Sequence, residues 1–300
     1  MRWRSYDWTG RQVLVTGAAS GIGRATAVLA ASRGAHLHLT DVNAEGLDET
    51  ATSIRTTGGS VLTSEALDVT DFEAVLEYAA QVTAEHGALD VVMNVAGISR
   101  WGTISGLEND EWRSLVEVNL MGPVHVLEAF VPPMVEARHG GHVVNVSSAA
   151  GIIGMPWHAA YSASKFGLRG VSEVLRFDLA RHGIGVSLVC PGGVDTGLTE
   201  TIRIAGVDRT SPAFHRAQAG FRKRAVTPES AAASILRGVE RKKYWVYTSH
   251  DIRAAHALQR WAPPAYAGLM HVFNRVANRV LPEVGRARAA DLEPVRKAAR

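Results

Sequence analysis

The sequence has a single cysteine, Cys190, among its 300 residues. An intrachain disulfide is therefore excluded, and a reducing compartment is the expected environment. The sequence also lacks any stretch close to the roughly 18 apolar residues that a membrane span requires, and no apolar run follows its basic N-terminus. We therefore expect a soluble, cytoplasmic protein, or at most one that is peripheral to a membrane.

A large net charge is missing as well, because 32 Lys and Arg residues face 29 Asp and Glu residues, which gives +3 at pH 7. With 46% hydrophobic and 20% charged residues, the composition is typical of a globular chain and excludes disordered or collagen-like classes. The charge is unevenly distributed: residues 1–200 hold 13 basic and 22 acidic residues, whereas residues 201–300 hold 19 and 7. An acidic body thus precedes a basic end.

Short runs rich in β-branched residues alternate with longer helical patterns along most of the chain. The strand-like runs are residues 12–16, 35–40, 61–63, 90–94, 142–147, 185–190 and 244–247, and the helical patterns lie near 22–33, 44–56, 71–86, 108–137, 158–182 and 227–241. This alternation predicts an α/β fold, a single Rossmann-type doubly wound domain with a seven-stranded parallel sheet and helices on both faces. We place this domain at residues 1–248 and a helical extension at 249–300.

A glycine-rich turn follows the first strand-like run. Gly17, Gly21 and Gly23 lie between that strand and the first helix, where glycines allow a tight turn, close approach of the backbone to a pyrophosphate, and close packing of helix on strand. The N-terminus of the helix adds unpaired N–H groups and a partial positive charge. The turn therefore predicts a dinucleotide site.

Asp41 ends the second strand-like run, 18 residues after Gly23. This is close to the roughly 20-residue offset at which an acidic residue hydrogen-bonds the adenosine ribose. Its charge would repel a 2′-phosphate, and neither Ser20 nor the two residues after Asp41 offer a basic side chain, so the sequence favours NAD over NADP. Arg24 is the one nearby cation, and a polar residue at a strand end also fits an ordinary strand terminus.

Tyr161 and Lys165 are four residues apart on an expected helix, so their side chains project from one face, one turn apart. A cation at that distance favours the phenolate and lowers the pKa of the phenol toward the working range of a general base. Ser148 lies at the carboxyl end of the fifth strand, at the edge where open α/β sheets bind ligands. Its hydroxyl could hold a substrate oxygen beside the phenol. The alternative is a surface tyrosine with an extended lysine beside it.

These segments together resemble the short-chain dehydrogenase/reductase family over about residues 10–247. The matching residues are the turn at 16–23, Asn94 to Gly97, Asn119, Ser148, Tyr161 to Lys165, and 191–196. The resemblance implies that Tyr161 is the acid/base, that Lys165 binds the nicotinamide ribose and lowers the Tyr161 pKa, and that Ser148 positions the substrate. Asn119 would kink its helix and hold a water in a proton relay.

The family resemblance also implies the contacts of the dinucleotide. Asp68 and Val69 would bracket the adenine, and the strand end at 94–97 would form the floor. The full expected set is Gly17, Ser20, Gly21, Ile22, Gly23, Asp41, Asp68, Val69, Asn94, Ala96, Gly97, Tyr161, Lys165, Pro191, Val194 and Thr196. One position departs from the family pattern, since Val95 stands where a second asparagine is usual.

The implied function is that of an NAD(P)-dependent oxidoreductase that interconverts a secondary alcohol and a ketone, using NAD in preference to NADP. Trp101, Met155, Trp157 and the segment 197–221 fall where the family places its pocket rim, which favours a bulky apolar substrate; core packing is the alternative. Two other functions stay open: a catalytically silent dinucleotide-binding sensor or scaffold, and an NADP-dependent biosynthetic ketoreductase.

The extension shows helical spacing of apolar residues interrupted by Pro263 and Pro264, with arginines interleaved, and predicts two amphipathic helices. Three roles are open: packing within the subunit or in a homo-oligomer (a dimer or tetramer), docking on a membrane surface, or covering a pocket for a long substrate. We expect no nucleic-acid binding, because the basic residues are dispersed. No metal site is expected, since His36 and His38 have no third ligand nearby.

Overall fold

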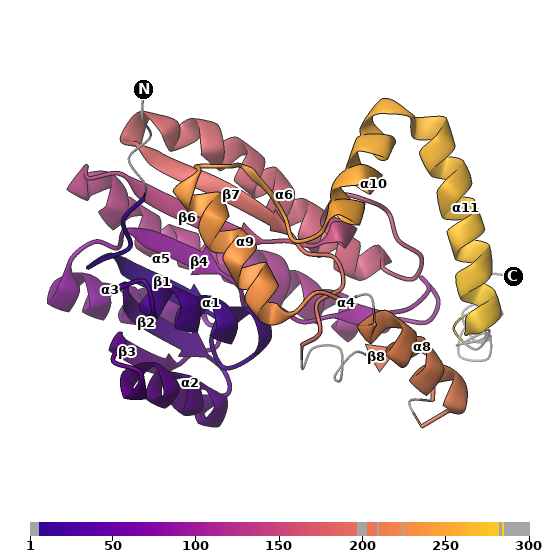
Figure 1. The fold of residues 1–300 in the computed structure, drawn as a ribbon, viewed down its shortest axis with the longest axis horizontal. Helices are drawn as coiled ribbons and strands as arrows, with labels where there is room; N and C mark the ends of the chain where they lie inside the picture. Colours follow the sequence, from indigo (N-terminus) through magenta and orange to yellow (C-terminus); the bar gives the residue numbers. More distant parts are fainter. Residues whose placement is uncertain (1–5, 197–202, 209, 224, 282–283, 285–300) are drawn as a thin grey trace, which may run out of the picture.

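The computed structural model describes residues 6–196, 203–208, 210–223, 225–281 and 284. Seven parallel strands form one sheet in the order β3-β2-β1-β4-β6-β7-β9 (Figure 1). The strands are β1 (Gln12–Thr16), β2 (His36–Asp41), β3 (Ser60–Ala66), β4 (Val91–Asn94), β6 (Gly141–Val146), β7 (Ile184–Cys190) and β9 (Trp245–Tyr247). The predicted fold class, a doubly wound parallel sheet, is therefore confirmed.

Helices cover both faces of this sheet, and each face has its own hydrophobic core. One core is made with α1 (Gly21–Ala31), α2 (Ala44–Thr56) and α9 (Pro228–Glu240), the other with α3 (Phe72–His86), α5 (Gly122–Ala137) and α6 (Ala159–Asp178). Strands β1 and β4 are buried on both sides, which explains their unbroken apolar runs. The sheet order reverses between these two strands, and open α/β sheets bind ligands outside the carboxyl ends of the strands at such a point.

The helical pattern at 108–137 is not one continuous α-helix. It divides into α4 (Asn109–Val116), a π-helical turn (Glu117–Met121) and α5. Pro123 has no N–H, so in an α-helix the carbonyl of Asn119 would lack its partner four residues later. The turn widens at this point, and π-turns inside helices are often found at functional sites.

Two strands of two residues each were not predicted. They are β5 (Arg100–Trp101) and β8 (Arg203–Ile204), which pair in parallel as a separate small sheet. Two residues are too few to show an alternating pattern, so no sequence signal marks them. Their pairing brings the segment after β7 over the segment after β4, next to the carboxyl edge of the main sheet.

The C-terminal extension contains the two expected helices, α10 (His250–Trp261) and α11 (Pro263–Val280). Helix α8 (Pro212–Arg222) lies earlier in the chain, before α9. Ile252 and Ala255 of α10 pack on the core around β7 and β9. Helix α11 folds back as an arm along one side of the molecule (Figure 1). The division of the chain at residue 248 stays a prediction, because α10 shares this core.

Among the described residues, one helical stretch, Asn109–Ala137, is long and apolar enough to cross a membrane by length and composition. We did not expect such a stretch from the sequence. In the fold it is α4, the π-turn and α5, and residues of α5 such as Phe130 and Met134 are buried in the core beneath the sheet. This packing explains part of its apolar character, because 39% of the apolar window is buried inside the protein.

Candidate active site

The turn after β1 is built around glycines that have no space for a side chain. Gly17 has a φ of 69°, and a Cβ there would lie 2.7 Å from the Cα of Ala96. A Cβ on Gly23 would lie 1.9 Å from the Gly17 carbonyl oxygen. The side chain of Ser20, at the N-cap of α1, makes no capping hydrogen bond, and the first turn of α1 has no acidic residue. The backbone N–H groups in the first turn of α1, with no carboxylate among them, suit an anionic pyrophosphate.

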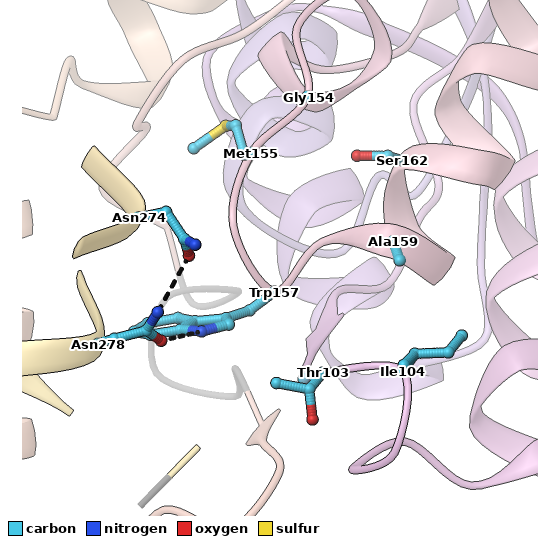
Figure 2. A pocket seen from close by; sticks show the side chains of 10 residues that line it. Thr103, Ile104, Gly154, Met155, Trp157, Ala159, Ser162, Asn274 and Asn278 are labelled. Carbon is cyan, nitrogen blue, oxygen red and sulfur yellow. Dashed lines mark hydrogen bonds between the residues drawn. The ribbon is translucent and has the colours of Figure 1, made fainter. Parts of the chain in front are cut away.

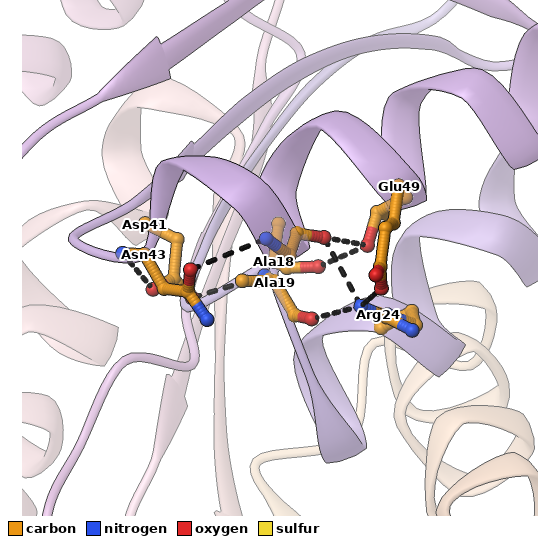
Figure 3. Close-up of polar contacts among 8 residues, drawn as sticks. Ala18, Ala19, Arg24, Asp41, Asn43 and Glu49 are labelled. Carbon is orange, nitrogen blue, oxygen red and sulfur yellow. Dashed lines mark hydrogen bonds and ion pairs between the residues drawn. The ribbon is translucent and has the colours of Figure 1, made fainter.

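Asp41 holds the glycine-rich turn against the end of β2 (Figure 3). Its carboxylate accepts hydrogen bonds from the N–H of Ala19 and the N–H of Asn43, both at 2.9 Å. Arg24 points elsewhere: its guanidinium donates to the Ala19 carbonyl at 2.5 Å and pairs with Glu49 at 2.9 Å. The one basic side chain near this strand end is therefore already neutralised by a carboxylate.

The segment after β4 is tied to the end of β1 by Thr16, the last residue of β1. Its hydroxyl accepts from the N–H of Val95 at 3.0 Å and from the N–H of Ala96 at 3.1 Å. Val95 packs against the core with α1 and α2, so the departure from the family pattern leaves this strand end anchored. Asn94 donates to the Asn145 side chain on the adjacent strand at 2.9 Å.

Asn119 clamps the π-turn to the segment after β4. Its amide oxygen accepts from the N–H of Ile98, and its amide nitrogen donates to the Ile98 carbonyl, both at 2.9 Å. A second contact reaches the Ser164 hydroxyl of α6 at 3.3 Å. Gly97 leaves room for this contact: a Cβ there would lie 2.9 Å from the Asn119 side-chain oxygen and 3.3 Å from Lys165 Nζ. That Asn119 holds a water stays a prediction.

Ser148, Tyr161 and Lys165 meet at the carboxyl edge of the sheet. Ser148 follows β6, and its hydroxyl accepts from the N–H of Ala150 at 3.1 Å while its side chain also hydrogen-bonds Tyr161. Lys165 lies one turn along α6 from Tyr161, with its ammonium 5.9 Å from the centre of the phenol ring. Lys165 Nζ donates to the carbonyl oxygen of Val146 at 3.0 Å, which aims the cation along the strand end.

Burial sets the protonation of this cluster. It raises the pKa of the Tyr161 phenol, and the hydrogen bond with Ser148 opposes that rise. Burial also lowers the pKa of Lys165 to about 8. Loss of hydration therefore dominates the environment of the phenol in the protein alone, and the lowering of the Tyr161 pKa by Lys165 stays a prediction.

Comparison with known proteins decides the family. A family model described as short chain dehydrogenase matches residues 11–205. An oxidoreductase named SadH, from Mycobacterium tuberculosis, is 36% identical over 269 residues, covering 88% of this chain and 95% of that protein. The chain belongs to the short-chain dehydrogenase/reductase family.

Two other short-chain dehydrogenases show how far this likeness extends. D-threitol dehydrogenase of Mycolicibacterium smegmatis is 39% identical over 189 residues, which cover 63% of this chain and 72% of that enzyme. A short-chain dehydrogenase from Burkholderia phymatum, crystallised in complex with NAD, superposes with a TM-score of 0.75 at 27% identity, covering 85% of this chain and 94% of that one. The neighbour with NAD bound supports a nicotinamide dinucleotide as the cofactor class.

The remaining expected cofactor residues of this short-chain dehydrogenase lie along the same edge. The Val69 carbonyl is bonded to the His125 ring at 2.9 Å, and Asp68 caps its own turn by accepting from Thr70. Pro191 accepts from the N–H of Ala149 at 2.7 Å. Thr196 lies against the glycine-rich turn, since a Cβ on Gly21 would be 3.0 Å from its methyl group. The structure also describes Ile22 and Val194, which pack at the start of α1 and in a bridge with Val226.

A cavity of about 390 Å³ lies between α11 and the loop that leads into α6 (Figure 2). It is lined by Gly102, Thr103, Ile104, Gly154, Met155, Trp157, Ala159, Ser162, Asn274 and Asn278. Met155 and Trp157 were expected at the pocket rim. Trp101 does not line the cavity; its ring is tilted against that of His158, with ring centres 4.4 Å apart. Residues 197–202 and 209 of the expected rim lie outside the described residues.

Trp157 is held in an uncommon backbone conformation at this cavity. It has a φ of 63°, which is uncommon for a side chain of this size, and its indole N–H donates to the Asn278 side chain of α11 at 3.1 Å. The extension therefore supplies part of the cavity wall. Within the parts of the chain that the structure describes, no group of three or more His, Cys, Asp or Glu side chains could hold a metal ion.

Sequence reasoning missed two supporting residues of the site. Thr16 was read only as the start of the glycine motif, although a hydroxyl at the last position of a strand can accept from a neighbouring strand end. The sequence gives no indication of Ser147, whose hydroxyl donates to the Lys165 carbonyl at 3.0 Å and fixes α6 on the strand end. A Thr before the first glycine was a visible signal, whereas Ser147 depends on tertiary packing.

Proposed function

We propose that this protein is an NAD-dependent dehydrogenase/reductase that interconverts a secondary alcohol and a ketone, with Tyr161 as the acid/base. The observation that carries this proposal is the meeting of Ser148, Tyr161 and Lys165 at the carboxyl edge of the sheet. The glycine-rich turn opens onto the same edge. A fold used only as a scaffold would have no need for this set.

In the oxidative direction, the alcohol loses a proton to the phenolate oxygen of Tyr161 and a hydride from its carbon, and becomes the ketone. The bound dinucleotide supplies the hydride acceptor, or the hydride donor in the reverse direction. The Ser148 hydroxyl holds the substrate oxygen beside the phenol. Lys165, held by the Val146 carbonyl, places its positive charge one turn away, where it stabilises the phenolate once the phenol has given up its proton.

The preference for NAD rests on Asp41 and on the engagement of Arg24. The Asp41 carboxylate lies at the end of β2 beside the turn, and a 2′-phosphate there would meet its charge. Arg24 is held by Glu49, so freeing it for a phosphate would cost that ion pair. An NADP-dependent ketoreductase is the competing assignment.

The cavity beside α11 supports a bulky, mainly apolar substrate. Met155, Trp157 and Ile104 contribute apolar surface, while Asn274 and Asn278 add two amides at its outer side. Most of a small-molecule site is apolar, with a few polar groups that fix orientation.

Two assays on the wild-type protein test this proposal. Fluorescence quenching by NADH and by NADPH measures the cofactor preference, and tighter binding of NADPH would contradict the role given to Asp41. An absorbance assay of nicotinamide reduction over secondary alcohols, including sterols and long-chain alcohols, measures turnover. Dinucleotide binding without turnover on any of these alcohols would favour the sensor or scaffold.

A further inference from the structure

Helix α11 presents its polar side toward the body of the protein and its apolar side away from it. Asn274 and Asn278 line the cavity, four residues apart on one face. The opposite face is formed by five apolar side chains that are each between 44% and 54% exposed: Leu269, Val272, Phe273, Val276 and Val280. We call these five the apolar stripe. Their spacing of three, four and seven residues places them on one line along the helix.

Contacts near both ends of α11 fix this orientation. The Tyr266 hydroxyl accepts from the N–H of Gly154 at 2.7 Å. At the far end, Asn278 is bonded to Trp157, and Leu281, just past the helix, is buried in a cluster with Ile204. The helix cannot rotate its apolar stripe inward without losing these contacts. Exposure of the stripe is therefore a property of how the arm docks on its own domain.

The groups around the apolar stripe are basic and aromatic. Arg275 and Arg279 lie on α11 along one edge of the stripe, and Trp261, 80% exposed, stands at the tip between α10 and α11. In the sequence, residues 250–300 contain nine basic and four acidic residues. An apolar face flanked by arginines, with a tryptophan at its end, is the pattern of helices that lie in a membrane interface.

We propose that the apolar stripe docks on an anionic lipid surface, with α11 lying in the plane of the interface. The five apolar side chains supply the inserted area, and Arg275 and Arg279 pair with lipid phosphates. A second copy of the chain fits less well, because five side chains are far fewer than the roughly 20–30 residues per side of a stable interface. A membrane span by α11 is excluded by its own Asn and Arg side chains.

This inference goes beyond the proposed reaction and does not depend on it, so its test uses binding alone. Full-length protein is sedimented with vesicles of pure phosphatidylcholine and with vesicles of equimolar phosphatidylcholine and phosphatidylglycerol. We expect binding to the anionic vesicles at low salt and weaker binding at high salt. Val272→Ser with Val276→Ser should lower the bound fraction at least tenfold, because two apolar side chains no longer insert into the lipid. Arg275→Gln with Arg279→Gln should remove the preference for anionic lipid.

A matched control replaces two exposed valines on other helices, Val28→Ser with Val174→Ser, and should bind vesicles as the wild type does. Each variant is also checked for NADH binding and for its sedimentation coefficient without vesicles. The proposal is overturned if the wild-type protein binds neither vesicle, or if the Val272/Val276 variant binds as tightly as the control. It is equally overturned if that variant dissociates an oligomer in solution, since a second copy then covers the apolar stripe.

Discussion

At the scale of single residues, burial changes the protonation of Tyr161 and Lys165, which we propose to act in acid/base catalysis. Burial disfavours the charged form of each group, so the pKa of the phenol rises while the pKa of the ammonium falls to about 8. For a proton to leave Tyr161, the fixed cation of Lys165 and the Ser148 hydroxyl must offset the free energy that a buried phenolate costs. The rigid anchoring of Lys165 on the Val146 carbonyl keeps the cation in place when it is needed.

Asp41 carries the prediction about the cofactor. Asp41→Asn keeps the shape of the side chain but removes its charge, and the amide still accepts one hydrogen bond from the turn. We expect NADH to bind roughly tenfold more weakly and the preference over NADPH to shrink, because a charged acceptor for the ribose is lost. Fluorescence titration of both dinucleotides measures this. Equal loss of NADH and NADPH affinity would show that Asp41 only supports the turn.

Thr16 gives a second prediction at this scale. Thr16→Val leaves the N–H groups of Val95 and Ala96 without their acceptor, at a cost of about 1–3 kcal/mol each if no water replaces it. We expect weaker dinucleotide binding and a lower melting temperature, whereas Thr16→Ser keeps the hydroxyl and should resemble the wild type. Calorimetry with and without NADH measures the melting temperature and the dinucleotide binding of both variants. Equal values for Thr16→Val and Thr16→Ser would show that the Thr16 hydroxyl has no role in the site.

At the scale of elements, the join between β1 and α1 carries a prediction with its own control. In Gly23→Ala the new Cβ would collide with the Gly17 carbonyl oxygen, which is rigid backbone, so the turn must open and dinucleotide affinity should fall roughly tenfold or more. Gly170→Ala, in the interior of α6 with open space around it, should raise the free energy of unfolding by about 1 kcal/mol. Binding titrations and urea unfolding of both variants check this pair. Normal binding by Gly23→Ala would contradict the geometry of the turn.

Elements that repeat a pattern over many residues were predictable, and elements set by single contacts were not. The seven strands and their helices follow from periodicity, and the order of the motifs placed Ser148, Tyr161 and Lys165 together. The π-turn depends on Pro123 and on the amide of Asn119, and β5 and β8 are too short to have a pattern. Periodicity likewise predicted that α11 is amphipathic, but only the contacts of Tyr266 and Asn278 determine which side faces outward.

At the scale of the whole molecule, buried histidines connect folding to pH. Burial lowers the pKa values of His38, His142 and His158 to about 4. His142 donates to Ser187, whose hydroxyl itself donates to the Lys243 carbonyl, so the ring is held neutral with its proton on Nε2. Unfolded histidines titrate near pH 6.5, so the folded state binds fewer protons between about pH 6.5 and 4.

The contribution of these three histidines to the free energy of unfolding is therefore complete above about pH 6.5 and is lost as the pH falls toward 4. Between pH 7 and pH 5, each of these histidines should remove about 2 kcal/mol from the free energy of unfolding. Urea titrations at the two values measure the loss, and His38→Gln, which can keep the contacts with Thr63 and Gln12, should reduce it by about a third. An unfolding free energy that does not change between these pH values would contradict the burial of the three rings.

The whole molecule also divides by charge: the acidic first 200 residues carry the glycine-rich turn with Ser148, Tyr161 and Lys165, and the basic end carries α10 and α11. Assembly into a homo-oligomer and a cytoplasmic location stay predictions. The basic end has a structural counterpart in the exposed stripe of α11 and its flanking arginines. The body and the arm meet at the cavity beside Trp157.

The most direct test of the account compares Tyr161→Phe with the wild-type protein on a secondary alcohol that the wild type oxidises. The phenylalanine keeps the ring and loses the one oxygen that takes the proton. Turnover should fall by about two to four orders of magnitude, as expected for loss of a general acid/base, while the Kd for NADH changes by less than about twofold. A variant that binds NADH normally and retains the wild-type rate would contradict the role of Tyr161 and the function proposed for this site.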